Sequence, residues 1–176
     1  MLYKEACAVQ KLFTVDEETR HAFRRPPRVE DLIAELENKA RFDSGELELT
    51  RGRIRLGKTR WWRNGEPIAY IGISVVNRAP LTPYELKYVW HNKGPRFVDG
   101  IFVRRLVVNK PDRSSGYGAI LLEELKTFAR QLCKRIYLDT KADNLPMRKL
   151  AMKAGGFPNM FWHTPNHTLM VRYIWT

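Results

Sequence analysis

The 176-residue chain contains only two cysteines, Cys7 and Cys133, and no long run of apolar residues. Two cysteines cannot form a disulfide framework, and neither belongs to a closely spaced pair of the kind that binds a metal. No stretch approaches the roughly 18 consecutive apolar residues that a membrane-spanning helix needs. Residues 1–7 also lack an apolar core of signal-peptide length. From these absences we expect a soluble, cytoplasmic protein with no bound metal and no contact with a membrane.

Acidic residues are scarce relative to basic ones, with 19 Asp and Glu against 31 Lys and Arg, a formal net charge of +12. The first 50 residues hold 8 basic and 11 acidic side chains, so the remaining 126 hold 23 basic and 8 acidic ones. This asymmetry is typical of a surface that meets an anion, such as nucleic acid or a phosphorylated cofactor. A solvated surface is the alternative and explains any single lysine or arginine. The length and an apolar fraction of 44% predict one domain over residues 1–176.

Hydrophobic periodicity changes along the chain between the patterns of helices and strands. The predicted helices cover residues 29–42, 116–132 and 146–154. The predicted strands cover residues 68–76, 97–108, 136–138 and 169–175, with Asn64-Gly65 as a hairpin signal before the first of them. Residues 4–13 and 84–90 fit either a helix or a strand. Hairpin strands followed by alternating strands and helices predict a mixed α+β fold.

The most informative segment is Arg113-Ser114-Ser115-Gly116-Tyr117-Gly118-Ala119, between a predicted strand and a predicted helix. Glycines there allow backbone N–H groups to turn toward one point. A helix N-terminus adds unpaired donors and the positive end of its dipole. The segment therefore predicts a pyrophosphate site, with an ordinary glycine-containing turn as the alternative. The motifs G-x-x-x-x-G-K-[ST] and G-x-G-x-x-G are both absent, which argues against the other common phosphate loops.

Two motifs resemble those of the GCN5-related N-acetyltransferase (GNAT) family. Residues 113–118 fit its [Q/R]-x-x-G-x-[G/A] signature, and residues 144–157 are similar to its second block, N-x-x-A-x-x-L-Y-x-K-x-G-F. The resemblance is strong over residues 97–157 and is absent in detail over residues 1–47, where the family itself varies. It implies a three-layer α/β/α fold with a mixed, mostly antiparallel sheet, flanked by helices and splayed at the cofactor site. Residues 1–47 would be a variable helical segment, and residues 97–157 the cofactor-binding core.

The resemblance also implies a co-substrate, acetyl-CoA or another acyl-CoA. The backbone amides from Ser114 to Ala119 would hold its pyrophosphate, and Arg113 would add a neighbouring positive charge. Backbone groups of a splayed strand and the family asparagine would contact the pantetheine arm and the thioester carbonyl. The implied cofactor-binding residues are Leu106, Val108, Arg113, Ser114, Ser115, Gly116, Tyr117, Gly118, Ala119 and Asn144. An amine would attack the thioester directly, and the enzyme would orient it, remove its proton and polarise the carbonyl.

The catalytic groups depart from the family pattern. Where the family often has a tyrosine that protonates the leaving thiolate, this chain has Ala151, and Gly155-Gly156 makes the block one residue longer. Another group supplies the proton, or the thiolate leaves unaided, or the protein binds acyl-CoA without turning it over. Asp99 is the first candidate for the general base and Glu85 the next, although Asp99 also fits a turn or solvent-facing carboxylate. His163 is a further acid–base candidate, with a plain polar turn as its alternative.

Residues 51–63 contain six basic residues, no acidic one and two tryptophans. Alternate residues of a strand share one face, so three of the arginines would lie together. Basic residues interleaved with tryptophan suit a phosphate backbone with stacked bases, whereas a solvated strand face is the alternative. The predicted contacts with nucleic acid or with the acyl acceptor are Arg51, Arg53, Arg55 and Arg60.

Two functions follow from these patterns. The first is an acyl-CoA-dependent N-acyltransferase, above all an N-acetyltransferase. Its basic surface favours a nucleic-acid-linked amine (aminoacyl-tRNA or a modified base) or an amine of a ribosome-associated protein over a cationic aminoglycoside. The second is a non-catalytic module of the same fold that binds acyl-CoA, RNA or DNA. We expect a monomer or a homodimer in either case.

Overall fold

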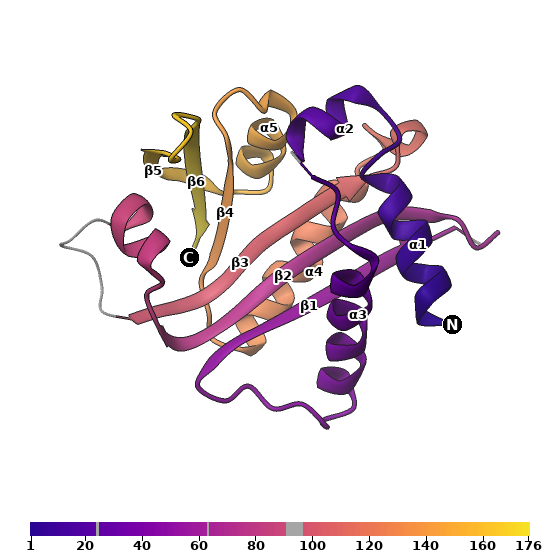
Figure 1. The fold of residues 1–176 in the computed structure, drawn as a ribbon, viewed down its shortest axis with the longest axis horizontal. Coiled ribbons are helices and arrows are strands. Elements are labelled where there is room, and N and C mark those ends of the chain that lie inside the picture. Colours follow the sequence, from indigo (N-terminus) through magenta and orange to yellow (C-terminus); the bar gives the residue numbers. More distant parts are fainter. Residues whose placement is uncertain (24, 63, 91–96) are drawn as a thin grey trace. The chain divides into compact units, whose positions relative to one another are not determined.

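The computed structural model describes residues 1–23, 25–62, 64–90 and 97–176 (Figure 1). Its α-helices are α1 (Leu2–Leu12), α2 (Glu17–Ala22), α3 (Val29–Asp43), α4 (Tyr117–Gln131) and α5 (Leu145–Lys153). Its strands are β1 (Gly52–Trp61), β2 (Pro67–Pro80), β3 (Phe97–Val108), β4 (Ile136–Lys141), β5 (Phe157–His163) and β6 (Leu169–Trp175). Two short helical turns complete the described elements, the π-helix η1 (Glu85–Val89) and the 3-10 helix η2 (Lys110–Asp112).

The strands form a six-stranded sheet in the order β1-β2-β3-β4-β6-β5. β6 is antiparallel to both β4 and β5, with Ile136 opposite Trp175 at one end of the β4–β6 pair and Lys141 opposite Met170 at the other. The predicted fold class, a mixed α+β fold with a mostly antiparallel sheet flanked by helices, is confirmed. The chain divides into two compact units, and the single domain expected over residues 1–176 stays a prediction.

The first unit comprises residues 1–48, 55–74 and 103–122. Apolar side chains of α1 and α3 pack on β2 and β3, as Figure 1 shows for the elements that carry them. These side chains recur every three or four residues, which places them on one face of each helix. The buried members are Ala6, Val9, Leu12, Phe13, Leu32, Leu36, Tyr70 and Val107. Because each fully buried Val, Leu or Phe contributes about 1.5–3 kcal/mol, this core holds both helices on the strands.

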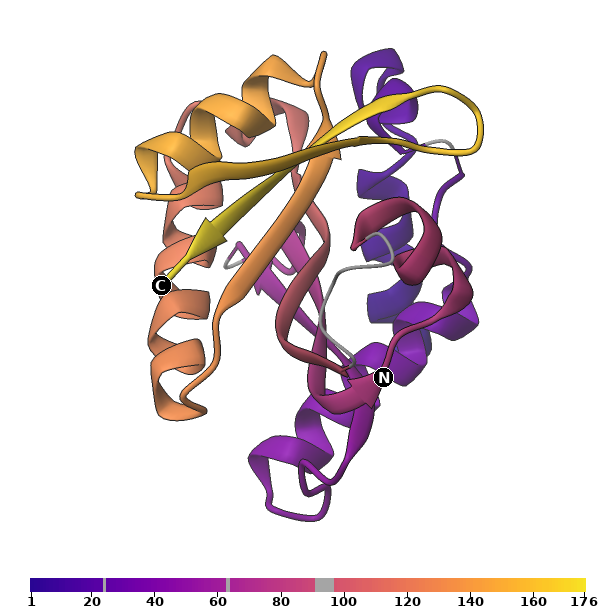
Figure 2. The ribbon, with the colours of Figure 1, turned by 90° about the vertical axis from the view of Figure 1, so that its left-hand side faces the viewer.

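The second unit comprises residues 49–54, 75–102 and 123–176. In Figure 2, β5 and β6 form a hairpin whose second strand pairs with β4. Helix α5 is followed by Gly155, with φ +84°, and then by Gly156, which passes close to Trp175. A Cβ at Gly156 would lie 2.5 Å from Trp175 Cζ2. Any residue other than glycine would therefore force the Trp175 ring or the backbone to move. The second glycine of the pair therefore has a packing role.

Most of the predicted elements are present. The helices expected over residues 29–42, 116–132 and 146–154 are α3, α4 and α5. Of residues 4–13, which fitted either element, residues 4–12 belong to α1. The apolar periodicity does not predict α2, which has six residues and no apolar stripe. Its signal is local: Asp16 caps the helix by accepting the Thr19 N–H at 2.8 Å. Among the described residues, no helix combines the length and apolar content needed to cross a membrane.

Candidate cofactor-binding site

The turn between β3 and α4 places backbone N–H groups at a helix N-terminus. Ser114 and Gly116 adopt left-handed backbone conformations, with φ +69° and +87°, and α4 begins at Tyr117. The Ile120 N–H donates to the Gly116 carbonyl at 3.0 Å. The N–H groups of residues 117–119 precede that first helical bond, so they have no acceptor within the helix and lie at the positive end of its dipole. This geometry can bind an anion, and binding of a pyrophosphate stays a prediction.

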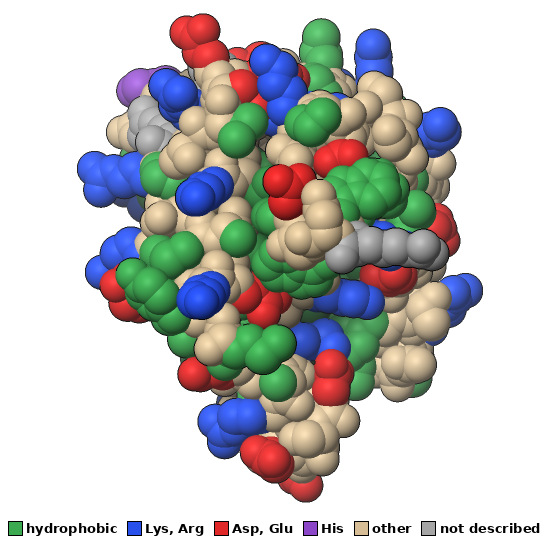
Figure 3. All heavy atoms as spheres, turned by 90° about the vertical axis from the view of Figure 1, so that its right-hand side faces the viewer, with side chains coloured by type: hydrophobic (Ala, Val, Ile, Leu, Met, Phe, Trp, Pro, Cys, Tyr) green, Lys and Arg blue, Asp and Glu red, His purple; other side chains and the backbone are tan. Residues whose placement is uncertain are grey.

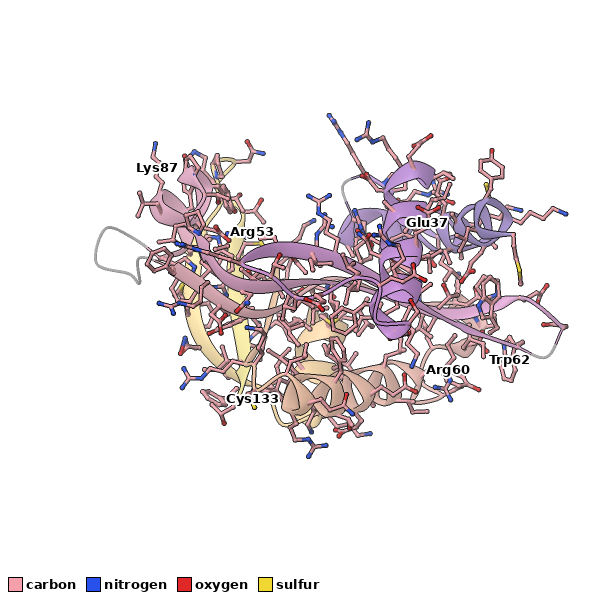
Figure 4. All side chains as sticks on the ribbon, turned by 90° about the horizontal axis from the view of Figure 1, so that it is seen from below. Glu37, Arg53, Arg60, Trp62, Lys87 and Cys133 are labelled. Carbon is pink, nitrogen blue, oxygen red and sulfur yellow. The ribbon has the colours of Figure 1, made fainter. Side chains whose placement is uncertain are left out.

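The end of β1 lies beside this turn, within the first unit. The Trp62 Nε1–H donates to Asp112 Oδ2 at 3.3 Å, and the Trp62 ring meets the Tyr117 ring edge-on at 5.8 Å between centroids. The Arg60 guanidinium lies over the Tyr117 ring, with Cζ 5.9 Å from its centroid. Figure 4 labels Arg60 and Trp62 near the end of β1. Arg60, predicted to contact the acceptor, lies beside the anion turn.

Arg113 links the turn to α2. Its Nη2 donates to Asp16 Oδ2 at 2.8 Å and to Thr19 Oγ1, its Nη1 donates to Glu18 Oε2 at 3.0 Å, and its Nε donates to the Val108 carbonyl at 3.3 Å. Burial raises the pKa of the Asp16 carboxyl, but hydrogen bonds from Thr19 and Arg113 outweigh burial and hold that pKa below its usual range. Two carboxylates thus share the charge that Arg113 was expected to offer to a phosphate. These contacts hold the turn against α2, and a contact of Arg113 with a phosphate stays a prediction.

The remaining predicted cofactor residues are divided between the two units. Leu106 is buried in β3, and the carbonyl of Val108 already accepts the Arg113 Nε–H. Asn144 lies in the second unit, where its Oδ1 caps α5 by accepting the Met147 N–H at 3.3 Å. Because Oδ1 accepts this bond, Asn144 would contact a cofactor through its Nδ2 hydrogens. The structure therefore groups residues 106–119 in one unit and places Asn144 in the other.

The sequence matches the model of the acetyltransferase (GNAT) family over residues 15–157. This chain belongs to the GNAT family. The family assignment made from residues 113–118 and 144–157 is confirmed, and the match extends it into the helical N-terminal segment. A comparison with curated proteins finds no match to this sequence.

Several solved GNAT acetyltransferases share the fold at low sequence identity. An aminoglycoside acetyltransferase, AAC(6')-Ib, in complex with coenzyme A is 16% identical with a TM-score of 0.66, over 100% of this chain and 91% of that chain. A protein from Desulfovibrio desulfuricans assigned to the GNAT family is 13% identical with a TM-score of 0.62, over 98% and 92%. The ribosomal-protein-S18-alanine N-acetyltransferase from Escherichia coli is 14% identical with a TM-score of 0.54, over 97% and 86%. At these identities the likeness establishes the fold.

The proposed general base of this GNAT protein, Asp99, is held in an ion pair. Asp99 Oδ1 accepts hydrogen bonds from Lys134 Nζ at 2.7 Å and from the Arg78 N–H at 3.1 Å. Burial raises the pKa of the Asp99 carboxyl, but these two donors outweigh burial and hold the pKa below its usual range. A carboxylate stabilised in this way is a weaker proton acceptor. The geometry favours a structural role for Asp99, and its catalytic role stays a prediction.

The other acid–base positions lie elsewhere in the second unit. His163 ends β5 on its exposed hairpin, opposite Leu169 of β6. Ala151, at the position of the tyrosine that often serves the GNAT family as proton donor, is fully buried in α5. This position therefore holds no proton donor. Any proton supplied to a leaving thiolate would come from another group or from solvent.

Three of the four arginines predicted to contact nucleic acid or the acceptor make side-chain contacts within the chain. Arg53 pairs with Glu85 through two hydrogen bonds of 2.9 and 2.6 Å, and Arg51 donates to the Arg78 carbonyl at 3.3 Å. Arg55 is exposed, and the sixth basic residue of the segment, Arg63, lies outside the described residues. On the face in Figure 3, Lys and Arg side chains are interspersed with acidic and hydrophobic ones rather than gathered in one patch. Part of the basic excess thus has structural partners.

Because Arg53 and Glu85 form an ion pair, we expect the free energy of unfolding to fall in acid. Burial raises the pKa of Glu85, but hydrogen bonds from Arg53 and Thr82 outweigh burial and lower that pKa. The pair therefore contributes stability above the unfolded-state pKa of about 4.3, and this stability is lost as the pH falls through the lower folded-state value. We expect Glu85→Gln to reduce the unfolding free energy by about 1 kcal/mol at pH 7 and to flatten its decline between about pH 5 and pH 3.

Urea unfolding of the wild type and Glu85→Gln across that pH range measures both effects. Glu37→Gln, with an exposed carboxyl on α3 (Figure 4), is the matched control and should keep the wild-type slope. Equal slopes for the wild type and Glu85→Gln would contradict the pairing.

Proposed function

We propose that this GNAT protein uses acetyl-CoA, or another acyl-CoA, as acyl donor and transfers the acetyl group directly to an amine. The observation that carries the proposal is the turn at residues 113–119, which combines the family signature with unpaired N–H groups at the start of α4. A diphosphate is the part of acyl-CoA that such a helix N-terminus recognises. The coenzyme A complex of AAC(6')-Ib, whose fold matches the whole chain, supports the same ligand.

The chain's own contribution is to bind, to orient and to move protons. When bound, acyl-CoA supplies the activated thioester. The Ser115 N–H donates to the Asp112 carbonyl at 3.3 Å, so the other N–H groups from Ser114 to Ala119 anchor the donor. The backbone at Leu106 and Val108 aligns its arm, and the reaction gains from proximity. Asp99 and His163 stay the proposed bases, and the ion pair between Asp99 and Lys134 makes His163 the better of the two.

For the acceptor, we propose an amine of a ribosome-associated protein or a nucleic-acid-linked amine. The net charge of +12 supports an acidic or phosphate-rich partner. The Escherichia coli neighbour that acetylates an alanine of ribosomal protein S18 supports the protein amine. The Glu85 carboxylate offsets the charge of Arg53, one of the four arginines proposed to contact a phosphate backbone. The protein amine is therefore the first acceptor to test.

A second function is favoured by one observation, the fully buried Ala151 at the usual proton-donor position. It is a non-catalytic GNAT-fold module that binds acyl-CoA, nucleic acid or both. Release of free thiol from acetyl-CoA separates the two functions. We expect release in the presence of a peptide with a free N-terminal amine or of aminoacyl-tRNA, and none with the N-acetylated peptide. Binding of acetyl-CoA without thiol release for any of these amines would establish the module instead.

The position of Arg60 predicts a role in donor binding. Because its guanidinium lies over Tyr117, the first residue of α4, it adds positive potential next to the anion turn. We expect Arg60→Gln to weaken acetyl-CoA binding about fivefold, a loss of about 1 kcal/mol for a partly exposed cation. Arg53→Gln is the matched control, because Arg53 pairs with Glu85. Calorimetric titration of both variants with acetyl-CoA tests this, and equal affinities for the two would contradict it.

A further inference from the structure

A buried arginine lies within an aromatic cluster in the second unit. Arg172, in the middle of β6, is only 2% exposed. Its Nε and Nη2 each donate to Asp139 of the neighbouring strand β4 at 2.6 Å. Its Cζ lies 4.8 Å from one ring centroid and 5.4 Å from three others. We term this set the Arg172 box; it comprises Arg172, Asp139, Trp90, Phe102, Tyr137 and Trp162.

Three N–H groups of the Arg172 box are buried and have no acceptor among the described residues: Arg172 Nη1, Trp90 Nε1 and Trp162 Nε1. The described part of the chain has one more buried, unpartnered side-chain polar atom, Thr59 Oγ1, which lies in the first unit. Buried donors are normally paired, because an unpaired donor has lost its hydrogen bonds to water without replacement. Three such donors in one cluster indicate a binding site, in which an acceptor atom of a ligand would form the missing hydrogen bonds.

Other tryptophans of the chain show that this pattern is local. The indole of Trp175, 6% exposed, donates to the Ala154 carbonyl at 3.0 Å. The indole of Trp62 donates to Asp112. Packing of a tryptophan in this protein is therefore compatible with a paired indole N–H. The unpaired indoles of Trp90 and Trp162 are a property of the Arg172 box.

The charge balance of the Arg172 box selects the ligand. The Asp139 carboxylate compensates the Arg172 guanidinium, so the box is close to neutral, and the surrounding rings make its environment apolar. A second carboxylate placed there would be a buried anion without a countercharge, which is strongly unfavourable. A neutral oxygen acceptor satisfies the same donors without that penalty. We propose that the Arg172 box binds the carbonyl oxygen of a neutral amide, with the attached planar group stacked among its rings.

Several members of the Arg172 box are partly exposed. The Asp139 side chain is 28% exposed, and Trp90, Phe102 and Tyr137 are half-buried. The donors themselves lie out of water, so a carbonyl that reaches them forms hydrogen bonds in a low-dielectric environment, where they are strengthened. Because binding needs no acyl transfer, this proposal stands or falls separately from the proposed function.

Titration of the ¹⁵N-labelled protein with three probes that share one ring tests the proposal: benzamide, benzoate and benzylamine. We expect benzamide to move the indole N–H signals of Trp90 and Trp162 downfield and to leave that of Trp175 in place. Single Trp→Phe variants assign the signals. Benzylamine, which offers no acceptor oxygen, should move neither signal. Unmoved signals with benzamide would overturn the proposal, and tighter binding of benzoate would overturn the choice of a neutral ligand.

Variants that replace the indole with a phenyl ring keep an aromatic side chain and remove the N–H, and a matched pair of them separates binding from stability. We expect Trp162→Phe to weaken benzamide binding about fivefold. Its melting temperature should fall less than that of Trp175→Phe, because both variants lose the same ring volume but Trp162→Phe loses no hydrogen bond within the chain. Trp175→Phe, the matched control, should lower the melting temperature and leave benzamide affinity unchanged. Trp90→Phe repeats the test if Trp162→Phe folds poorly. Equal benzamide affinity for the wild type and both box variants would contradict a role of these donors.

Discussion

Replacement of Gly116 by aspartate is expected to weaken acetyl-CoA binding at least 100-fold. A Cβ at Gly116 would meet no atom within 4 Å, so the substitution causes no clash in the free protein. It places a carboxylate where the N–H groups of the turn converge, next to the proposed pyrophosphate. Repulsion between unit charges about 4 Å apart at a protein surface amounts to about 4 kcal/mol. This exceeds the roughly 2.7 kcal/mol that corresponds to a 100-fold loss.

The matched control for this substitution is Gly155→Asp. Gly155 has φ +84° against +87° for Gly116, and its Cβ would also meet nothing within 4 Å. Both variants therefore carry the same added charge and the same left-handed strain of about 1–2 kcal/mol. Calorimetric titration with acetyl-CoA should show wild-type affinity for Gly155→Asp. Wild-type affinity for Gly116→Asp would remove the assignment of the turn.

Replacement of Glu35 by glutamine is expected to lower the free energy of unfolding by more than the replacement of Glu85 does. Glu35, on α3, is 1% exposed and accepts hydrogen bonds from Tyr70 Oη at 2.5 Å, from Arg104 Nη1 at 2.8 Å and from Arg105 Nη1. Burial raises the pKa of the Tyr70 hydroxyl, so it stays protonated and remains a donor. Glutamine keeps the volume but removes the countercharge of two arginines. Loss of one partner from a buried ionic network costs about 3 kcal/mol.

Thermal unfolding measures this effect. For a chain of this length, about 3 kcal/mol corresponds to a drop in melting temperature of roughly 6–12 °C. Glu37→Gln makes the same chemical change at an exposed position of the same helix and should shift stability by no more than about 0.5 kcal/mol. Equal shifts for the two variants would contradict a network centred on Glu35.

Local signals made the fold and the anion turn predictable from sequence. The apolar stripe over residues 116–132 and the glycines at 116 and 118 identify α4 and its N-terminus from neighbouring residues alone. The pairings of Asp99 with Lys134 and of Arg113 with Asp16 join residues 35 and 97 positions apart. Such pairs depend on the tertiary fold. The sequence pattern therefore could not show that Asp99 pairs with a lysine or that Arg113 pairs with a carboxylate.

The same limit applies to the basic excess. Arg172 stands in the middle of an apolar strand, and that position was the only local sign that it belongs to the interior. Arg104 and Arg105 pair with the buried Glu35, and Arg53 pairs with Glu85. The amino-acid composition does not distinguish these paired arginines from arginines that are free on the surface. The structure shows that several of them form ion pairs within the fold. The net charge of +12 is therefore larger than the positive charge that is available to bind a nucleic acid.

Backbone amide spectra of the ¹⁵N-labelled protein, titrated with acetyl-CoA, report most directly on the turn at residues 113–119. We expect the signals of Gly116 and Gly118, among the 11 glycines of the chain, to move downfield in saturable fashion as their N–H groups bind the pyrophosphate. The Gly155 signal should stay in place. Saturable binding of acetyl-CoA that leaves Gly116 and Gly118 unmoved, or no binding at all, would contradict the account.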